Sequence, residues 1–160
     1  MSLYASIIPS PLGPVSVRCT DTAIQEIRFL EEGALIKIEK HPLLDACTTQ
    51  LQAYFEGKLK NFDLPVAQTG TDFQQKVWAL LLKVPYGKTQ TYLHLSNTYG
   101  DVKAIRAVAA ANGKNNIAIV IPCHRIIGSN GSLTGYAGGL YRKKWLLEHE
   151  IKTKQTLLHF

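Results

Sequence analysis

Cysteines are few in this sequence, and their number and spacing exclude a disulfide-stabilised fold. Only three occur among 160 residues, Cys19, Cys47 and Cys123, an odd number at irregular intervals. Small domains held together by disulfide bonds carry an even set at recurring spacings. We therefore expect free thiols and a reducing, intracellular compartment, which would be the cytoplasm, or the nucleus in a eukaryote.

Long apolar runs are lacking as well. No stretch approaches the roughly 18 consecutive apolar residues of a membrane span. The opening residues, MSLYASIIPSPLGP, do not have the basic start and continuous apolar run of a signal peptide. We expect no membrane partner, and with 46% hydrophobic residues the chain can still bury a core.

Acidic side chains are scarce in the second half of the chain. Residues 1–70 carry six basic and eight acidic side chains, whereas residues 71–160 carry twelve basic and four acidic ones. The whole chain has a formal charge of +6 and a pI near 9.3. A basic balance suits a polyanion such as DNA, although many basic proteins bind none. If DNA binds, we expect it to contact the C-terminal half.

The first 70 residues predict a small sheet covered by a helix. Short apolar or alternating runs at 3–8, 15–19 and 23–29, separated by proline, glycine and aspartate, predict three strands. Residues 41–58 place apolar side chains at helical spacing, and Gly57 would end that helix. Residues 60–70 are typical of a linker. The chain thus divides into two expected domains, at 1–70 and 71–160.

The second half predicts mainly helices. Thr71 and Gln74 form a capping-box pattern at the start of one helix. Two short helices should follow at 92–99 and 102–112, with Gly100 and an Asp101 cap between them, a helix-turn-helix pattern.

The second of these short helices, KAIRAVAAAN, is rich in alanine. It is either a tightly packed buried helix or a recognition helix slim enough for close contact with a groove. The β-branched run at 117–121 predicts a buried strand. A glycine-rich loop at 128–139 leads to a final helix.

Cys123 is the main candidate for chemistry. It follows the apolar run and Pro122, and precedes His124 and Arg125. A buried, inert cysteine is common. A cysteine reacts as its thiolate, however, and a nearby imidazole can take the proton. Because adjacent side chains on an extended chain point apart, His124 would need a turn or a bridging water.

The segment Ile-Pro-Cys-His-Arg-Ile closely resembles the active-site signature of the O6-alkylguanine-DNA alkyltransferases. Further similarities occur in the same order at 73–78, 84–87, 91–92, 106–108, 115, 136–140 and 146–150, and the opening 10–13 is also similar. The resemblance implies an α/β fold of the α+β kind. A small ribonuclease-H-like N-terminal domain would precede a mainly helical, winged-helix-like domain that binds DNA and carries Cys123.

The resemblance also implies a reaction. An alkyl group would move irreversibly from O6 of guanine, and also from O4 of thymine, in duplex DNA to Cys123. The activity would be that of a self-inactivating methylated-DNA–[protein]-cysteine S-methyltransferase. Glu150 would orient His124, which would draw the proton of Cys123 through a water. Tyr92 would supply a proton near guanine N3, and Asn115 would brace the site.

The target atom lies inside a duplex, so the base must leave the stack. By resemblance, Arg106 enters the space that the base leaves. Ala107 and Ala110 are small enough to let their helix approach the minor groove. Lys103 and Arg125 are expected to contact DNA as well. The implied partner is double-stranded DNA with an alkylated guanine, bound by a monomer.

The implied base pocket is lined by Ile126, Tyr136 and Ala137, beside Cys123, and Lys143 matches a family lysine next to it. The family usually has a hydroxyl residue at the position of Ala137, so a side-chain hydrogen bond is excluded there.

No cofactor or metal is expected. The glycines after residue 128 lack the spacing and context of a nucleotide-binding turn. Some relatives hold a structural zinc, but only Cys19 lies near such a ligand position.

Three other functions compete with this hypothesis. A lesion sensor on the same fold would bind the flipped base but lack the cysteine, and Cys123 is present. A cysteine hydrolase would share the Cys-His-acid trio, but it would turn over and would need neither Tyr92 nor Arg106. A plain helix-turn-helix regulator would not depend on Cys123.

Overall fold

Three antiparallel strands form the first layer of the computed structural model, which describes residues 3–158, with side chains as far as Lys154. They are β1 (Tyr4–Ile8), β2 (Val15–Cys19) and β3 (Ile24–Phe29), in the sheet order β1-β2-β3. Val15, Val17 and Cys19 are fully buried in the central strand. The three predicted strands are confirmed.

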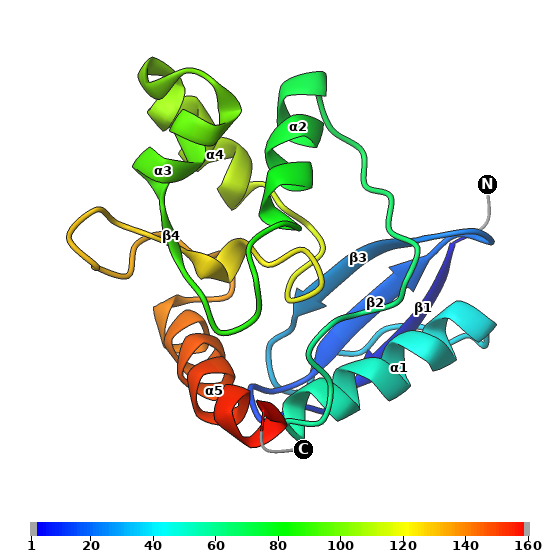
Figure 1. Ribbon diagram of the computed structural model, residues 1–160. Helices are drawn as coiled ribbons and strands as arrows, with labels where there is room; N and C mark the ends of the chain where they lie inside the picture. The colour runs from blue at the N-terminus through cyan, green and yellow to red at the C-terminus, as the bar shows by residue number, and fades with distance from the viewer. Residues whose placement is uncertain (1–2, 159–160) are drawn as a thin grey trace.

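Helix α1 (Pro42–Phe55) packs against β1 and β2 (Figure 1). The imidazole of His41 accepts a hydrogen bond from the Leu43 N–H at the start of the helix, where Pro42 has no N–H and so needs no acceptor. Gly57 ends the helix with a positive φ of 75°, and its N–H donates to the Tyr54 carbonyl. The buried face consists of Leu44, Cys47, Leu51 and Tyr54. The predicted helix and its glycine end are confirmed.

Residues 60–70 cross from this part of the chain to the next as extended backbone. The segment is bonded to the sheet, because the Ile24 N–H donates to Pro65 O and the Ala67 N–H donates to Ile24 O. Residues 60–70 are therefore attached to the β3 edge of the sheet. The sequence predicted only a linker and not this attachment.

Helix α2 (Asp72–Leu81) begins with the predicted capping box. The Thr71 hydroxyl accepts from the Gln74 N–H at 3.1 Å, and the Gln74 side chain accepts from the Thr71 N–H at 3.0 Å. Each side chain satisfies a backbone donor that the first turn leaves free.

We expect Thr71→Ala to lower the free energy of unfolding by about 1 kcal/mol, the usual cost of losing such a cap. Thr98→Ala is the matched control, because Thr98 is exposed and bonds only to the preceding turn of its own helix. Urea denaturation of both variants measures the difference, and equal losses would contradict the assignment of the cap.

The helix-turn-helix is present (Figure 1). Helix α3 (Tyr92–Tyr99) ends at Gly100, which has a φ of 111°. The Asp101 carboxylate then caps the 3-10 turn η1 (Val102–Ala104), and α4 (Ile105–Gly113) follows directly. The predicted second helix thus begins with one tighter turn.

The strand predicted at 117–121 is wrong. Only Ile117 makes a strand-like bridge, to Ile27, and the chain then turns, so that the Ile121 N–H donates to Ile117 O. Ile119 lies in the left-handed region with a φ of 70°, which a β-branched residue adopts only under strong local constraint. A buried turn and a buried strand share the same apolar pattern, so the sequence does not separate them.

The final helix α5 (Leu140–Leu158) lies across the end of α1 (Figure 1). A two-stranded parallel pair, β4 (Gln90–Thr91) with β5 (Ile126–Ile127), connects the helix-turn-helix to the active-site segment. Within residues 3–158, none of the helices has the length and apolar character required to cross a membrane.

Candidate active site

Cys123 lies in a tight turn, η2 (Cys123–Arg125), that follows Pro122. The Arg125 N–H donates to Pro122 O at 3.1 Å, and all three side chains of the turn are at least nine-tenths buried. We expected that His124 could serve Cys123 only if the chain turned there or a water bridged the two. The turn is present, and the side chains of a 3-10 turn do not alternate between two sides as in a strand.

Glu150 lies on α5, 25 or more residues away in sequence, and its carboxylate meets this turn. His124 Nε2 lies 2.7 Å from Glu150 Oε2, with both side chains fully buried. With Nε2–H donating to the carboxylate, His124 Nδ1 keeps its lone pair and can accept a proton. Nδ1 has no hydrogen-bond partner among the described residues. The structure thus brings together the predicted base and its orienting acid.

Arg125 also binds Glu150, and its predicted contact with DNA is a correction. Its Nε and Nη2 donate to the two carboxylate oxygens at 2.8 and 3.1 Å, and Nη1 donates to Val84 O at 2.8 Å. Only 7% of Arg125 is exposed. A basic residue next to a nucleophile suggested a phosphate contact, whereas this guanidinium faces the interior.

Charges and burial set the protonation of the site. Burial raises the pKa of the Cys123 thiol, although the Asn115 side chain and the Lys143 charge oppose this. Burial lowers the pKa of His124 against the effect of Glu150. Burial would raise the pKa of Glu150, but His124 and Arg125 outweigh it and hold that pKa well below its usual range. Near neutral pH the site therefore holds a thiol, a neutral imidazole and a carboxylate.

Asn115 braces the turn at 117–121, which leads directly to Pro122 and Cys123. Its amide nitrogen donates to Ile117 O at 3.2 Å and to Ile121 O at 2.9 Å, and its oxygen accepts from Gln68 at 2.7 Å. The side chain is buried. Asn115 therefore links the end of α4, the turn at 117–121 and the connecting segment.

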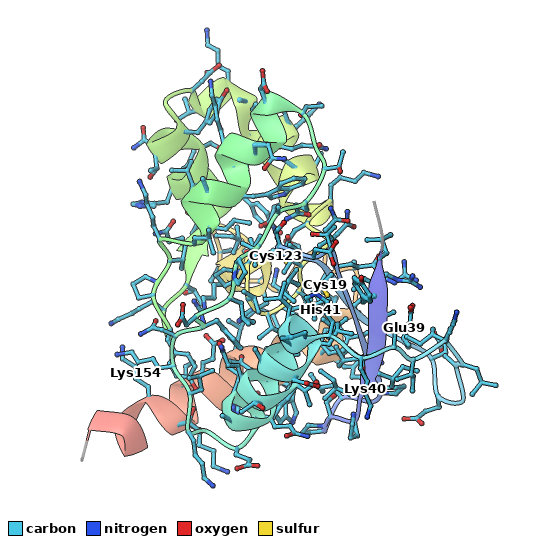
Figure 2. The ribbon with its side chains drawn as sticks, turned by 90° about the vertical axis from the view of Figure 1, so that its right-hand side faces the viewer. Cys19, Glu39, Lys40, His41, Cys123 and Lys154 are labelled. Atoms are coloured by element: carbon cyan, nitrogen blue, oxygen red, sulfur yellow. The ribbon has the colours of Figure 1, made fainter. Side chains whose placement is uncertain are left out.

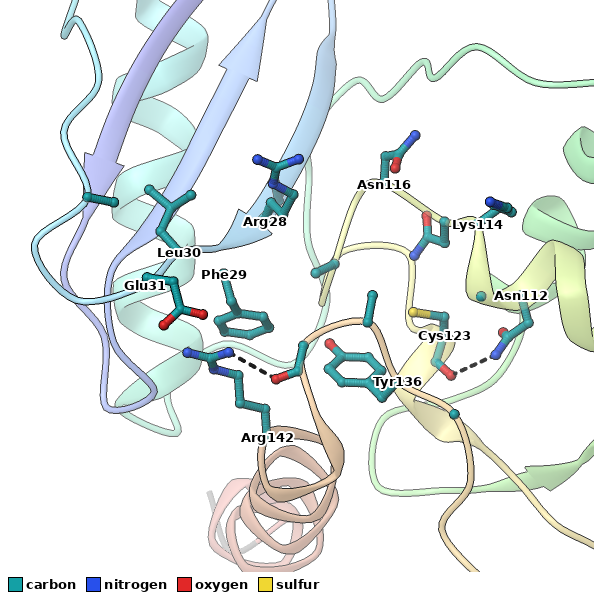
Figure 3. A pocket seen from close by; sticks show the side chains of 18 residues that line it. Arg28, Phe29, Leu30, Glu31, Asn112, Lys114, Asn116, Cys123, Tyr136 and Arg142 are labelled. Atoms are coloured by element: carbon teal, nitrogen blue, oxygen red, sulfur yellow. Dashed lines mark hydrogen bonds between the residues drawn. The ribbon is translucent and has the colours of Figure 1, made fainter.

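Cys123 opens into a pocket of about 640 Å³ (Figure 3). Tyr136 and Ala137 line it, as expected, together with Phe29 at the end of β3. The Asn112 amide donates to Cys123 O at 3.4 Å, as the figure shows. The pocket thus lies between the end of the sheet and the active-site turn.

Ile126 does not line the pocket as predicted, and Lys143, which was expected next to the pocket, lies outside it. Ile126 and Lys143 are fully buried and line neither this pocket nor its neighbour. Lys143 Nζ donates to Ile126 O at 2.5 Å and to Thr134 O at 2.8 Å. Lys143 therefore holds β5 and the glycine-rich loop together. These two bonds support the wall of the pocket from outside it.

A second hollow, of about 610 Å³, shares a wall with the first. The shared residues are Asn112, Gly113, Gly135, Tyr136 and Ala137. Tyr92 and Arg106 line its outer part, and the Tyr92 hydroxyl donates to Thr134 O at 3.2 Å. The predicted DNA-contacting arginine and the predicted proton donor thus face one hollow next to the cysteine pocket.

Helix α4 has a packed inner face and an exposed outer face, so it combines features of the two alternatives that its sequence left open. Val108, Ala111 and Asn112 face the core, whereas Arg106, Ala107 and Ala110 are exposed, as is Lys103 just before the helix. A helix with a small, basic outer face can approach DNA closely while its inner face packs.

Sequence reasoning missed Tyr54, Gln68 and Asn112. The Tyr54 hydroxyl donates to Glu150 Oε2 at 2.6 Å, and the Gln68 amide donates to Asn115. Both residues precede position 71, so no local pattern links them to the site. Asn112 was visible only as one end of an alanine-rich helix.

The other two cysteines, Cys19 and Cys47, are buried thiols outside the site. Burial raises the pKa of the Cys47 thiol to about 12, and it raises that of Cys19 as well. Figure 2 marks Cys19 and His41 in the part of the molecule built from the sheet and α1. No group of three or more potential metal ligands occurs among the described residues.

Comparisons with known proteins agree over nearly the whole chain. The model for the DNA binding domain of 6-O-methylguanine DNA methyltransferase matches residues 72–152, and that for its ribonuclease-like domain matches residues 3–68. A methylated-DNA–protein-cysteine methyltransferase of Methanosarcina barkeri is 45% identical over 153 residues, covering 92% of this chain and 97% of the relative. The enzyme of that name from Mycobacterium tuberculosis is 44% identical over 152 residues, covering 92% of each.

Solved structures are similar as well. The crystal structure of the M. tuberculosis O6-methylguanine methyltransferase matches with a TM-score of 0.86 at 40% identity, covering 95% of this chain and 94% of that one. The same protein in complex with DNA matches with a TM-score of 0.85 at 42% identity, covering 94% of each chain.

Proposed function

The chain belongs to the 6-O-methylguanine DNA methyltransferase family, and we propose on this basis that it repairs DNA by transferring an alkyl group from O6 of guanine to its own Cys123. Its activity is that of a methylated-DNA–protein-cysteine methyltransferase. One observation carries the assignment of the site. Cys123 opens into a pocket from a turn whose histidine is hydrogen-bonded to a buried glutamate.

The proposed reaction begins with the loss of the Cys123 proton. His124 accepts it at Nδ1 through a bridging water, and Glu150 stabilises the imidazolium that forms. The sulfur then attacks the alkyl carbon from the side opposite O6, so that a carbon–sulfur bond forms as the carbon–oxygen bond breaks. Guanine takes a proton near N3 from Tyr92 and leaves as the neutral base; solvent then returns a proton to Tyr92, and His124 releases the proton that it took from Cys123. The thioether product is a poor leaving group, so each molecule reacts once.

The base reaches this site by rotating out of the duplex. Arg106 enters the space that it leaves, while Ala107, Ala110 and Lys103 contact the minor groove and its phosphates. O4-alkylthymine would fit by the same route.

The proposed division into units is 1–70, which supports the site, and 71–160, which binds DNA. We infer a monomer that acts in the cytoplasm.

The proposed function is tested by incubating the protein with a duplex that contains one O6-methylguanine. The intact mass should rise by one methylene group, located at Cys123 by peptide mapping, and the DNA should then contain unmodified guanine. Repair of more than one lesion per protein molecule would instead show a hydrolase. Binding without any mass change would show a lesion sensor.

Arg106→Ala is expected to slow repair of duplex DNA by at least tenfold, because nothing then fills the space left by the base. Repair of a single-stranded substrate should change much less, since no stacked partner has to be replaced. Binding of the parent protein should weaken with added salt, as basic groups displace counterions. Lys103→Ala is the matched control for loss of one positive charge on the same exposed face. If Arg106→Ala and the parent repair duplex DNA equally fast, the role of Arg106 is wrong.

A further inference from the structure

Tyr54 comes from α1, far in sequence from Cys123, His124 and Glu150, yet its hydroxyl reaches their hydrogen-bond network. The Tyr54 oxygen lies 2.6 Å from Glu150 Oε2, the same oxygen that His124 Nε2 approaches at 2.7 Å. We propose that Tyr54 is a positioning residue of the proton relay, which shares Glu150 Oε2 with His124 and so limits the negative charge that His124 receives. The inference rests on the proposed function and adds a role for the N-terminal part of the chain.

Tyr54 is held firmly enough to act in this way. Its side chain is fully buried, and its own carbonyl accepts a hydrogen bond from His149 Nε2 at 2.7 Å. Two successive residues of α5, His149 and Glu150, therefore bind the two ends of Tyr54. Its ring also packs edge-on against Tyr86, with ring centres 6.1 Å apart. The hydroxyl has little freedom to find another acceptor.

Orientation of the carboxylate does not depend on Tyr54. Arg125 binds both oxygens of Glu150 with two parallel hydrogen bonds, and such a fork fixes the carboxylate plane. The Gly87 N–H adds a further donor to Oε1 at 3.3 Å. What the Tyr54 hydroxyl changes is the charge on Oε2, because each donor to a carboxylate draws negative charge toward itself.

The charged and titratable groups that face this network come from several segments. They are Cys123 and Arg125 of the active-site turn, Lys143 on α5, Tyr54 on α1, Tyr86 in the loop before β4 and Tyr136 in the loop before α5. Of these, only Arg125 and Tyr54 share the Glu150 carboxylate with His124 through side-chain hydrogen bonds within the described part of the chain.

Because Tyr54 and His124 share Glu150 Oε2, the reactivity of Cys123 is affected, and this thiol can react only once. When His124 is a weak base, Cys123 stays protonated in the free protein, and electrophiles in solution alkylate it slowly. Removing the Tyr54 hydroxyl directs more of the Glu150 charge to His124, so the pKa of His124 should rise. The imidazole then takes the Cys123 proton more readily, and unproductive alkylation becomes faster.

The test measures His124 directly in the intact protein. In Tyr54→Phe, titration of the His124 ring by nuclear magnetic resonance should show a pKa raised by about half a unit, the scale of one shared hydrogen bond. Alkylation of Cys123 by iodoacetamide at pH 7, which forms a carbon–sulfur bond and releases iodide, should become about threefold faster, the factor that half a pKa unit represents. The acid limb of the methyl-transfer profile should shift to higher pH by the same amount.

Tyr86→Phe is the matched control, because Tyr86 is buried against Tyr54 but bonds to the Thr153 hydroxyl instead of Glu150. It should leave the His124 titration unchanged. A 3-fluorotyrosine at position 54 keeps the shape and is a stronger donor, so it should lower the pKa of His124.

An unchanged or lowered His124 pKa in a folded Tyr54→Phe protein would overturn the proposal, as would an equal shift in Tyr86→Phe. If Tyr54→Phe does not fold, an unchanged pKa in the fluorotyrosine protein overturns it. The titration needs no DNA, so it remains decisive about Tyr54 even if the parent protein fails to transfer a methyl group.

Discussion

Replacing Cys123 by alanine is expected to abolish alkyl transfer completely, the largest effect of any single substitution in this protein. The described part of the chain has two other thiols, Cys19 and Cys47, and both are fully buried in the core. Neither of them lines the pocket of Cys123 or the hollow beside it, so an alkylated base bound there does not reach them. Intact mass after incubation with O6-methylguanine DNA should show no increase in Cys123→Ala.

Cys123→Ser separates chemistry from binding. The hydroxyl is a far weaker nucleophile near neutral pH, so transfer should again be undetectable, while affinity for the alkylated duplex should stay within about twofold of the parent. Cys47→Ser serves as the control for loss of a buried thiol and should keep full stoichiometric transfer. A methyl group found on any residue of Cys123→Ala would contradict the assignment of the nucleophile.

Glu150→Gln should slow transfer by about 100-fold or more, the scale of a lost general-base system. Without the carboxylate, the pKa of His124 falls below the value that burial already lowers, so the imidazole no longer holds the Cys123 proton. Transfer then depends on solvent deprotonating a thiol whose pKa is raised. The single-turnover rate of Glu150→Gln should therefore climb steadily from pH 7 to about 9, whereas that of the parent stays level.

His124→Ala should resemble Glu150→Gln, and combining the two changes should cost little more than either one, because the residues act as a unit. Additive losses would show that Glu150 and His124 contribute separately. An unchanged pH profile in Glu150→Gln would remove the relay altogether.

Stability needs its own control, because Glu150→Gln leaves the buried Arg125 charge unpaired. That should cost about 3 kcal/mol or more of unfolding free energy. The double variant Arg125→Gln with Glu150→Gln removes both charges, so the melting temperature should partly recover while transfer stays slow. A recovery of the rate together with stability would mean that Glu150 acts only as structural support.

Much of the fold was predictable because its signals are local. The capping box of Thr71 and Gln74, the glycine that ends α1 and the Gly100–Asp101 connection each rest on two to four neighbouring residues. The strand predicted at 117–121 failed for the same reason. Its residues are as apolar as those of a strand, and only the tertiary setting places Ile119 at a positive φ.

Cys123 and the adjacent His124 could be chosen from the residues themselves, but the rest of the site was predictable only through family resemblance. No spacing rule joins His124 to Glu150, since β5, the glycine-rich loop and the first part of α5 lie between them. Arg125 shows the limit of this reasoning, because a charged residue was assigned to the surface by type. A partner 25 residues away was needed to bury it. Tyr54 could not be predicted from the sequence either, because the residue that its hydroxyl contacts, Glu150, is 96 positions away.

The carboxylate of Glu150 accepts hydrogen bonds from Tyr54 on α1, from Gly87 and from the turn that carries His124 and Arg125. None of these donors can lose its acceptor without leaving a buried polar group unsatisfied, at a cost of about 1–3 kcal/mol each. Separation of α1 from α5 would break the bond from Tyr54 to Glu150 and also the bond from His149 Nε2 to the Tyr54 carbonyl. The two halves of the chain should therefore unfold cooperatively, and the reactive centre should be lost in the same transition as the interface between them.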